Sequence, residues 1–352
     1  MTHLWVRAEL RPQEERVGLL PDGVAALRAA GFRVTIEDSP QRAMPLAPFL
    51  DAGAERAACG SWPTAPDDAI IFGLKELPED DSPLRHRHIM FGHAYKGQPA
   101  GQDLLRRFQT GGGALYDLEY LTDEQGRRVA AFGYWAGFAG AAVSLLAYAA
   151  QARGGVCAPV TRFADKGAIV DAVAQALAGL DLPRVLIIGV LGRVGRGAAD
   201  LCAALGAPVT AWDKAETATG GPFPEVLAHD VFLNCILAMP GTPVFVHGSA
   251  ITAPRALRVI GDIACDPTSD FSPIKVYTRS TDWARPVLRV HGAPVLDVMA
   301  IDNLPSLLPL EASEEFSAQL LPHLETLGAI DIGVWARARQ EFDRALAGMA
   351  AS

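Results

Sequence analysis

The sequence predicts an α/β protein with two doubly wound parallel-sheet domains that flank a cleft. Short apolar runs alternate with helix-forming segments along most of the chain, as strands and helices do in parallel sheets. The length of 352 residues predicts two domains rather than one. Half of the residues are hydrophobic, which is enough to fill two cores.

The first part of the chain alternates between the two element types. The expected strands cover residues 4–6, 32–38, 68–75, 89–93 and 114–120. The expected helices cover residues 21–30, 47–54 and 102–109. Strands that are separated by helices pair in parallel, so this part predicts an α/β domain.

The second part repeats this order. Helices are expected from residue 135 and over 166–180 and 196–205, and strands over 185–188, 207–212, 230–235, 257–262 and 295–300. Two helices follow, and Trp335, Phe342, Leu346 and Met349 share one face of the last at the helical period. We expect these C-terminal helices to return to the first domain.

A glycine turn directly follows the buried run 185–188. Gly189, Gly192 and Gly195 are spaced G-x-x-G-x-x-G, and the strand after the next helix ends at Asp213. Glycines let the backbone approach a pyrophosphate, and a carboxylate at that strand end can accept ribose hydroxyls. The pattern predicts a Rossmann-like NAD site. The alternative is an ordinary strand–helix turn, because the usual spacing is G-x-G-x-x-G.

These elements set the expected domain boundaries. Residues 1–133 together with 306–352 are expected to form the substrate-binding domain, and residues 134–305 the NAD-binding domain.

Charge and cysteine usage restrict the class of protein. The net charge of −9 and pI of about 5.4 argue against nucleic acid or an anionic membrane as a partner. The five cysteines form no C-x-x-C pair, and no histidine cluster has metal-ligand spacing. We expect a reduced, cytoplasmic protein without a metal. The uncharged stretch 129–152 is long enough to span a bilayer, but its Ala and Gly content favours a buried helix.

Several charged residues lie where strands of the first domain are expected to end. Lys75 and Glu76 follow one strand, and His93 and Lys96 follow the next. Ligands of open α/β sheets bind at such ends, and neighbouring cations would lower a lysine pKa enough for it to act as a base. Taken singly, each residue fits a solvated loop charge better, and it is the cluster at two strand ends that favours a site.

Other polar residues have two interpretations. Arg16 and Arg128 lie in loops and fit either carboxylate binding or an ordinary surface position. Asp302 follows the last strand and fits a helix cap equally well. Polar neighbours indicate surface positions for four histidines, namely His86, His88, His229 and His323.

Long motifs resemble one enzyme family. They include Gly73-Leu74-Lys75-Glu76, Tyr116-Asp117-Leu118-Glu119, the stretches 126–133 and 136–141, Leu191-Gly192-Arg193, Gly220-Gly221-Pro222-Phe223, and Leu304-Pro305-Ser306-Leu307-Leu308-Pro309. Together the matching stretches cover nearly the whole chain. They resemble the NAD-dependent, lysine-forming saccharopine dehydrogenases, within the alanine dehydrogenase and transhydrogenase group.

The resemblance implies roles for individual residues. Lys75 and His93 correspond to the catalytic lysine and histidine. The implied substrate-binding residues are Arg16, Lys96, Glu119, Arg128, Phe132 and Asp302. The implied NAD-binding residues are Gly189, Leu191, Gly192, Arg193, Val194, Gly195, Asp213, Cys235 and Asp302. The implied substrates are saccharopine, L-lysine and 2-oxoglutarate, and a monomer is one expectation for the assembly.

One departure and two alternatives accompany this resemblance. Val194 occupies a position where fungal members are expected to carry cysteine, so Cys235 is expected to lack a disulfide partner. By itself, Cys235 also fits a small buried hydrophobe. The alternatives are a related opine or amino-acid dehydrogenase, such as alanine dehydrogenase, and a non-catalytic NAD-binding protein.

Overall fold

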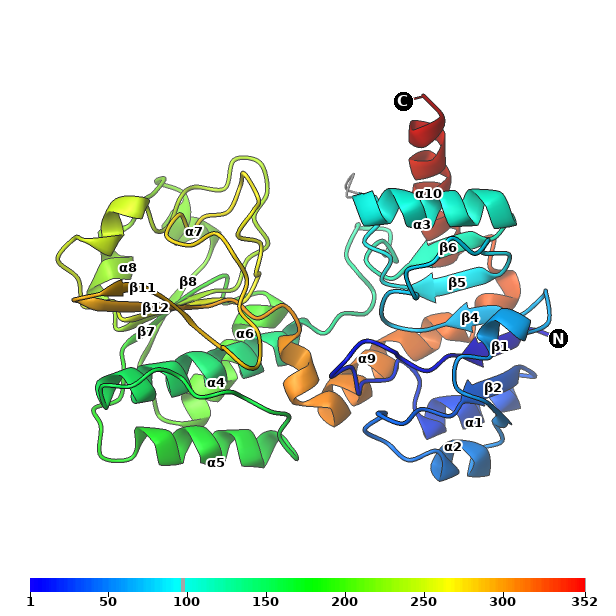
Figure 1. Ribbon diagram of the computed structural model, residues 1–352, viewed down its shortest axis with the longest axis horizontal. Helices are drawn as coiled ribbons and strands as arrows, with labels where there is room; N and C mark the ends of the chain where they lie inside the picture. Colours follow the sequence, from blue (N-terminus) through cyan, green and yellow to red (C-terminus); the bar gives the residue numbers. More distant parts are fainter. Residues whose placement is uncertain (96–98, 352) are drawn as a thin grey trace. The chain divides into compact units, whose positions relative to one another are not determined.

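The computed structural model describes residues 1–95 and 99–351 and divides the chain into two compact units (Figure 1). Unit 1 contains residues 1–131 and 309–352, and unit 2 contains residues 132–308. These divisions lie close to the boundaries expected at 133/134 and 305/306.

Unit 1 is built on a six-stranded parallel sheet with the order β3-β2-β1-β4-β5-β6. The strands are β1 (His3–Val6), β2 (Arg33–Glu37), β3 (Glu55–Ala57), β4 (Ile70–Phe72), β5 (Arg87–Met90) and β6 (Ala114–Asp117). This is the doubly wound order, in which the chain turns back at the β1–β4 pair. The α/β prediction is confirmed, although the short, partly exposed β3 was not expected.

The helices of unit 1 include both C-terminal helices. They are α1 (Pro21–Ala29), α2 (Ala47–Asp51), α3 (Pro99–Gly111), α9 (Pro309–Leu324) and α10 (Gly333–Ala351). Hydroxyls of Ser313 and Ser317 in α9 accept the backbone N–H groups of Val17 and Leu20. In α10, Trp335 packs edge-on against Tyr116 of β6. The expected return of these helices to the first domain is therefore confirmed.

Unit 2 contains a second sheet with the order β11-β12-β10-β9-β7-β8. The strands are β7 (Val185–Ile188), β8 (Val209–Trp212), β9 (Val231–Asn234), β10 (Val259–Asp262), β11 (Leu288–Gly292) and β12 (Val295–Met299). Only the edge strand β11 runs antiparallel, in a hairpin with β12. The sequence did not predict β11, in which Leu288 and Val290 alternate with Arg289 and His291 and no residue is fully buried.

The longest helix of unit 2 is buried, as its composition predicts. The helices are α4 (Gly133–Ala152), α5 (Lys166–Leu177), α6 (Arg193–Ala204), α7 (Lys214–Thr217) and α8 (Pro224–Ala228). Among the described residues, α4 alone is long and apolar enough to cross a membrane, and most of it is buried in the unit. A Cβ atom on Gly137 would lie 1.8 Å from the Val194 carbonyl oxygen, so glycine allows α4 to pack closely against α6.

Several element ends differ from their expected positions. Helix α6 begins at Arg193 rather than at residue 196, because Gly192 is extended and caps it. Strands β4 and β5 end at Phe72 and Met90, before the expected residues 75 and 93. The polar residues that follow therefore lie in loops beyond the sheet.

The surface assignment was wrong for His86 and His88, which are both about 1% exposed. Both lie on or beside β5, an inner strand, where position in the sheet outweighs their polar neighbours. The His86 ring nitrogen contacts the Ala65 carbonyl oxygen at 3.1 Å. His88 packs edge-on against Trp62 and Phe108. His229 and His323 are half-buried.

We expect His88 to make the fold acid-sensitive. Burial holds the pKa of His88 well below its usual value of 6.5. The unfolded chain therefore takes up the proton more readily, so this contribution to stability is complete above pH ~6.5 and is lost as pH falls. The loss is at most about 1.4 kcal/mol per pH unit for one proton.

This acid sensitivity can be measured by urea unfolding between pH 7 and pH 5. His88→Phe should lose less stability over that interval than the wild type, whereas the control His291→Gln should follow the wild type. Equal pH slopes for His88→Phe and wild type would exclude His88 as the cause.

Candidate functional site

The candidate site of unit 1 lies at the carboxyl ends of β1, β4, β5 and β6. Val6, Phe72, Ile89 and Tyr116 pair across β1, β4, β5 and β6 in one row of the sheet. Lys75, His93 and Glu119 follow the ends of β4, β5 and β6 respectively. Ligands of doubly wound sheets bind beyond this edge, at the point where the strand order reverses.

Lys75 follows β4, one of the two strands between which the strand order reverses. Two charged residues after β1 hold the peptide of Lys75. Glu9 accepts the backbone N–H groups of Leu74 and Lys75 at 2.6 and 3.0 Å. Arg7 donates from Nη2 to the Lys75 carbonyl oxygen. The Lys75 residue itself is half-buried. The sequence motifs identified Lys75 but did not indicate that Arg7 and Glu9 hold its peptide.

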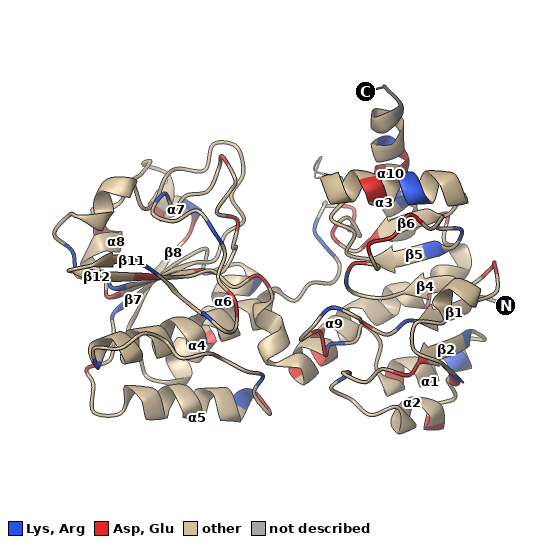
Figure 2. Cartoon of the chain, in the orientation of Figure 1, with Lys and Arg blue, Asp and Glu red and all other residues tan. Residues whose placement is uncertain are grey.

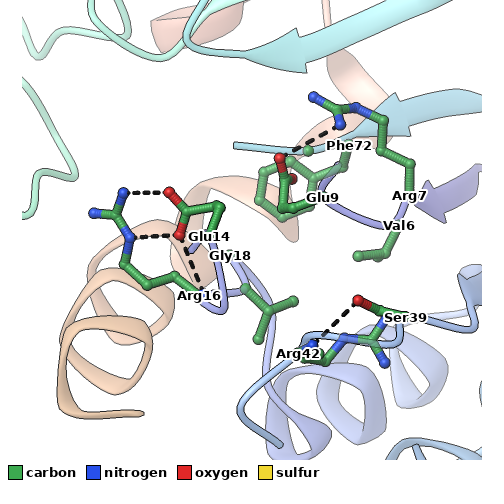
Figure 3. A pocket seen from close by; sticks show the side chains of 11 residues that line it. Val6, Arg7, Glu9, Glu14, Arg16, Gly18, Ser39, Arg42 and Phe72 are labelled. Carbon is green, nitrogen blue, oxygen red and sulfur yellow. Dashed lines mark hydrogen bonds and ion pairs between the residues drawn. The ribbon is translucent and has the colours of Figure 1, made fainter. Parts of the chain in front are cut away.

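Arg16 forms a buried ion pair with Glu14 (Figure 3). Its Nε and Nη2 atoms donate to the two carboxylate oxygens of Glu14 at 2.7 and 2.6 Å. Burial would raise the pKa of Glu14, but Arg16 outweighs burial and holds that pKa below its usual value, with a smaller contribution from the charge of Lys75. The sequence predicted Arg16 as a carboxylate ligand, and in the structure this guanidinium binds a carboxylate of the protein itself.

His93 and Glu119 lie together after neighbouring strands. Nδ1 of His93 is 3.9 Å from a Glu119 carboxylate oxygen, and the His93 side chain is 50% exposed. The backbone of His93 has φ +49°, an uncommon conformation for a residue other than glycine. Such strain is often found at functional sites.

Buried Asp117 organises both of these loops. Its carboxylate accepts the backbone N–H of Gly92 at 3.2 Å and that of Glu119 at 2.9 Å. Asp117 is fully buried at the end of β6. It lies within one of the quoted family motifs, but its role depends on the pairing of β5 with β6.

The remaining predicted substrate residues are spread over both units. Lys96 lies outside the described residues. Arg128 is exposed in unit 1, in an antiparallel bridge with Thr122. Phe132 precedes α4 in unit 2, and exposed Asp302 follows β12 in the same unit.

The glycine turn of unit 2 has the shape that a pyrophosphate requires. Gly189 has φ +93°, and a Cβ atom on Gly195 would lie 2.1 Å from the Gly189 carbonyl oxygen. Because α6 begins at Arg193, Gly195 lies in its first turn, where backbone N–H groups lack partners within the helix. Leu191 is exposed at the turn, while Arg193 and Val194 are half-buried. The turn therefore fits a dinucleotide phosphate.

Asp213 contacts this turn directly. One carboxylate oxygen accepts the Leu191 N–H at 3.1 Å, and the other accepts the Lys214 N–H at 2.9 Å. Asp213 also forms a capping box with Glu216 at the start of α7. A carboxylate has about four acceptor positions, so both oxygens can still accept ribose hydroxyls.

Cys235 directly follows β9, whose carboxyl end neighbours that of β7. It is buried as a free thiol, and burial raises its pKa. The thiol is thus kept protonated beside the turn. Nearby, the buried Asp262 carboxylate accepts hydrogen bonds from Asn234 and Tyr277, a network that the sequence did not predict.

Comparisons with known proteins give a consistent picture. Residues 5–139 match the family described as alanine dehydrogenase/PNT, N-terminal domain. A Schizosaccharomyces pombe protein named saccharopine dehydrogenase [NAD(+), L-lysine-forming] is 45% identical over 97% of this chain and 97% of its own length. A Neurospora crassa protein of the same name is 45% identical over 98% of this chain and 97% of its own.

Solved structures share the fold. An L-alanine dehydrogenase has a TM-score of 0.68 at 20% identity and covers 98% of this chain and 94% of its own. A transhydrogenase from Sinorhizobium meliloti has a TM-score of 0.65 at 18% identity, covering 95% of this chain and 97% of its own. At such identities the likeness shows the fold alone. The full-length matches to curated relatives go further and show that this chain belongs to the family of NAD(+)-dependent, L-lysine-forming saccharopine dehydrogenases.

Proposed function

We propose that this chain cleaves saccharopine oxidatively and reversibly to L-lysine and 2-oxoglutarate, with NAD as its cofactor. The observation that carries the proposal is the placement of Lys75, His93 and Glu119 after three neighbouring strands of unit 1. The names of the full-length relatives support the substrate and the cofactor.

The residues of unit 2 fit the cofactor. The N–H groups around Gly192 and Gly195 would bind the pyrophosphate, and Asp213 would accept hydrogen bonds from the adenosine ribose. Cys235 would lie near the nicotinamide half of the cofactor. It follows β9, and the strand order of this sheet reverses between β7 and β9. When bound, NAD⁺ would supply the acceptor for the hydride from the glutamate-side Cα.

The residues of unit 1 would handle the protons. Lys75 takes the proton from the secondary amine of saccharopine as the substrate imine forms. His93 activates the water that attacks this imine and then transfers protons as the carbinolamine collapses. Glu119, whose carboxylate oxygen lies 3.9 Å from Nδ1 of His93, would bind the substrate ammonium.

Substrate carboxylates require cations that are placed locally. Acidic and basic positions are interspersed along both units, and the net charge is −9 (Figure 2). We assign this role to Arg16, Lys96 and Arg128, with Phe132 and Asp302 completing the substrate contacts. Arg16 already binds Glu14 through Nε and Nη2, so a substrate carboxylate would share this guanidinium with Glu14. Monomeric assembly and a cytoplasmic location remain separate proposals that rest on the sequence.

A substrate panel tests the proposed reaction. NADH oxidation is followed with 2-oxoglutarate and L-lysine, with 2-oxoglutarate and ornithine, and with pyruvate and ammonia. We expect the highest kcat/KM for lysine with 2-oxoglutarate, because this pair carries the carboxylates that Arg16, Lys96 and Arg128 are proposed to bind, whereas pyruvate with ammonia carries fewer. A higher value for pyruvate with ammonia would favour alanine dehydrogenase chemistry. Binding of NADH without turnover of any pair would indicate a non-catalytic protein.

Lys75→Met should lower kcat by roughly two to four orders of magnitude, the usual contribution of one acid–base group. The Kd for NADH should change little, because Lys75 belongs to unit 1 and the glycine turn to unit 2. Steady-state kinetics and NADH fluorescence titration measure the two effects. Retention of more than roughly a tenth of the wild-type kcat would remove Lys75 from this role.

Asp213 should set the preference for NAD over NADP. Its carboxylate repels a ribose 2′-phosphate, so Asp213→Asn should reduce the ratio of NAD to NADP efficiency by roughly 10-fold or more. Glu216→Gln is the matched control, because it alters the same capping box without changing the ribose acceptor. A wild-type enzyme that used both cofactors equally well would contradict the assignment.

A further inference from the structure

We propose that Arg7 and Glu9 are positioning residues that hold the peptide of Lys75 and thereby aim its side-chain amino group. This inference rests on the proposed function, in which Lys75 takes the substrate proton. Arg7 and Glu9 act through Lys75 rather than on the substrate itself. The contacts that support it lie within unit 1, between the carboxyl ends of β1 and β4.

Glu9 binds the N–H side of the Lys75 peptide. One of its oxygens accepts the Leu74 N–H at 2.6 Å, and the other accepts the Lys75 N–H at 3.0 Å. The second oxygen also lies 3.4 Å from Nη1 of Arg7. All these partners are donors, as an ionised carboxylate requires. Glu9 is only 7% exposed, and leaving any of these groups unpaired in a buried site would be costly.

Arg7 binds the C=O side of the same peptide. Its Nη2 atom donates to the Lys75 carbonyl oxygen, while Nη1 contacts Glu9 and the Ala8 carbonyl oxygen. The guanidinium lies against Gly73, where an added Cβ atom would be 2.3 Å from Nε of Arg7. Glycine at position 73 therefore gives the guanidinium the space it occupies.

These side chains continue the contact between the β1 and β4 chains beyond the end of their backbone pairing. Backbone pairing between β1 and β4 ends with the bond from Arg7 N to the Phe72 carbonyl oxygen, three residues before Lys75. Beyond this bond, the side chains of Arg7 and Glu9, rather than the backbone of β1, contact the chain that follows β4. Lys75 is thereby fixed where its charge acts on Glu14. Proton transfer depends on such placement, since an error of ~1 Å can cost about 100-fold in rate.

Three variants remove the interaction in different ways. Glu9→Gln removes one acceptor, Arg7→Met removes the donor to the carbonyl oxygen, and Gly73→Ala displaces the guanidinium without changing a charge. Each should lower kcat by at least roughly 10-fold and leave the Kd for NADH unchanged. Arg7→Lys keeps a donor and a charge, so it should recover part of the activity that Arg7→Met loses.

The matched control is Asp297→Asn. Asp297 is a fully buried carboxylate of unit 2 that Arg289 and Gln151 bind. Its loss should lower the unfolding temperature as the loss of a buried ion pair does, but it should leave kcat unchanged in the molecules that remain folded.

A chemical readout follows Lys75 independently of turnover. The folded protein is labelled briefly with an amine-reactive acetylating reagent, and the modified lysine peptides are quantified by mass spectrometry. In Glu9→Gln, Arg7→Met and Gly73→Ala, labelling of Lys75 should change by several-fold. Labelling of Lys166, Lys214 and Lys275 should match the wild type. This readout separates the inference from the proposed function, because it reports the placement of Lys75 whether or not Lys75 is catalytic.

The results can overturn the inference cleanly. If Gly73→Ala and Arg7→Met keep the wild-type kcat and the wild-type labelling of Lys75, then Arg7 and Glu9 do not position Lys75. Lys75→Met could stay active while labelling of Lys75 changes in the Arg7, Glu9 and Gly73 variants. Lys75 would then not be the base, but Arg7 and Glu9 would still position it. Should Glu9→Gln fail to fold, Gly73→Ala and Arg7→Lys still decide, since neither removes a buried charge.

Discussion

The parallel pairing of β1, β4, β5 and β6 is the constraint on which the site of unit 1 depends. It brings four carboxyl ends to the same end of the sheet, so residues far apart in sequence become neighbours there. A shift of one residue in the register of β4 would turn the side chains of that strand to the opposite face of the sheet. Unit 2 uses the same geometry, with the glycine turn after β7 and Cys235 after the neighbouring β9.

Buried charge is concentrated at this edge, and the structure compensates each charge locally. Glu14 is paired with Arg16, Glu9 with Arg7, and Asp117 with two backbone N–H groups. Burial of unpaired ions would cost several kcal/mol each, so these contacts are required for the fold as well as for the site. They also leave the loops little freedom, which suits a site that must direct protons.

The sequence predicted features that local pattern encodes and missed those that depend on pairing between distant strands. The glycine turn follows from spacing and flanking strands, and Lys75 and His93 follow from their places after apolar runs. Arg7, Glu9 and Asp117 could not be assigned roles, because their partners are known only once β1–β4 and β5–β6 pairing is known. His88 was misassigned because polar neighbours say nothing about an inner strand. The edge strand β11 was missed because its apolar and polar residues alternate and form no apolar run.

The central claim is that Lys75 and His93 belong to one proton-handling site. A double-mutant cycle tests it directly, with kcat/KM for saccharopine and NAD⁺ measured in wild type, Lys75→Met, His93→Gln and the double variant. Groups that act as a unit are not additive, so the double variant should lose at least roughly 10-fold less than the product of the single losses. Losses that multiply fully would contradict a shared site and assign the two residues to independent roles.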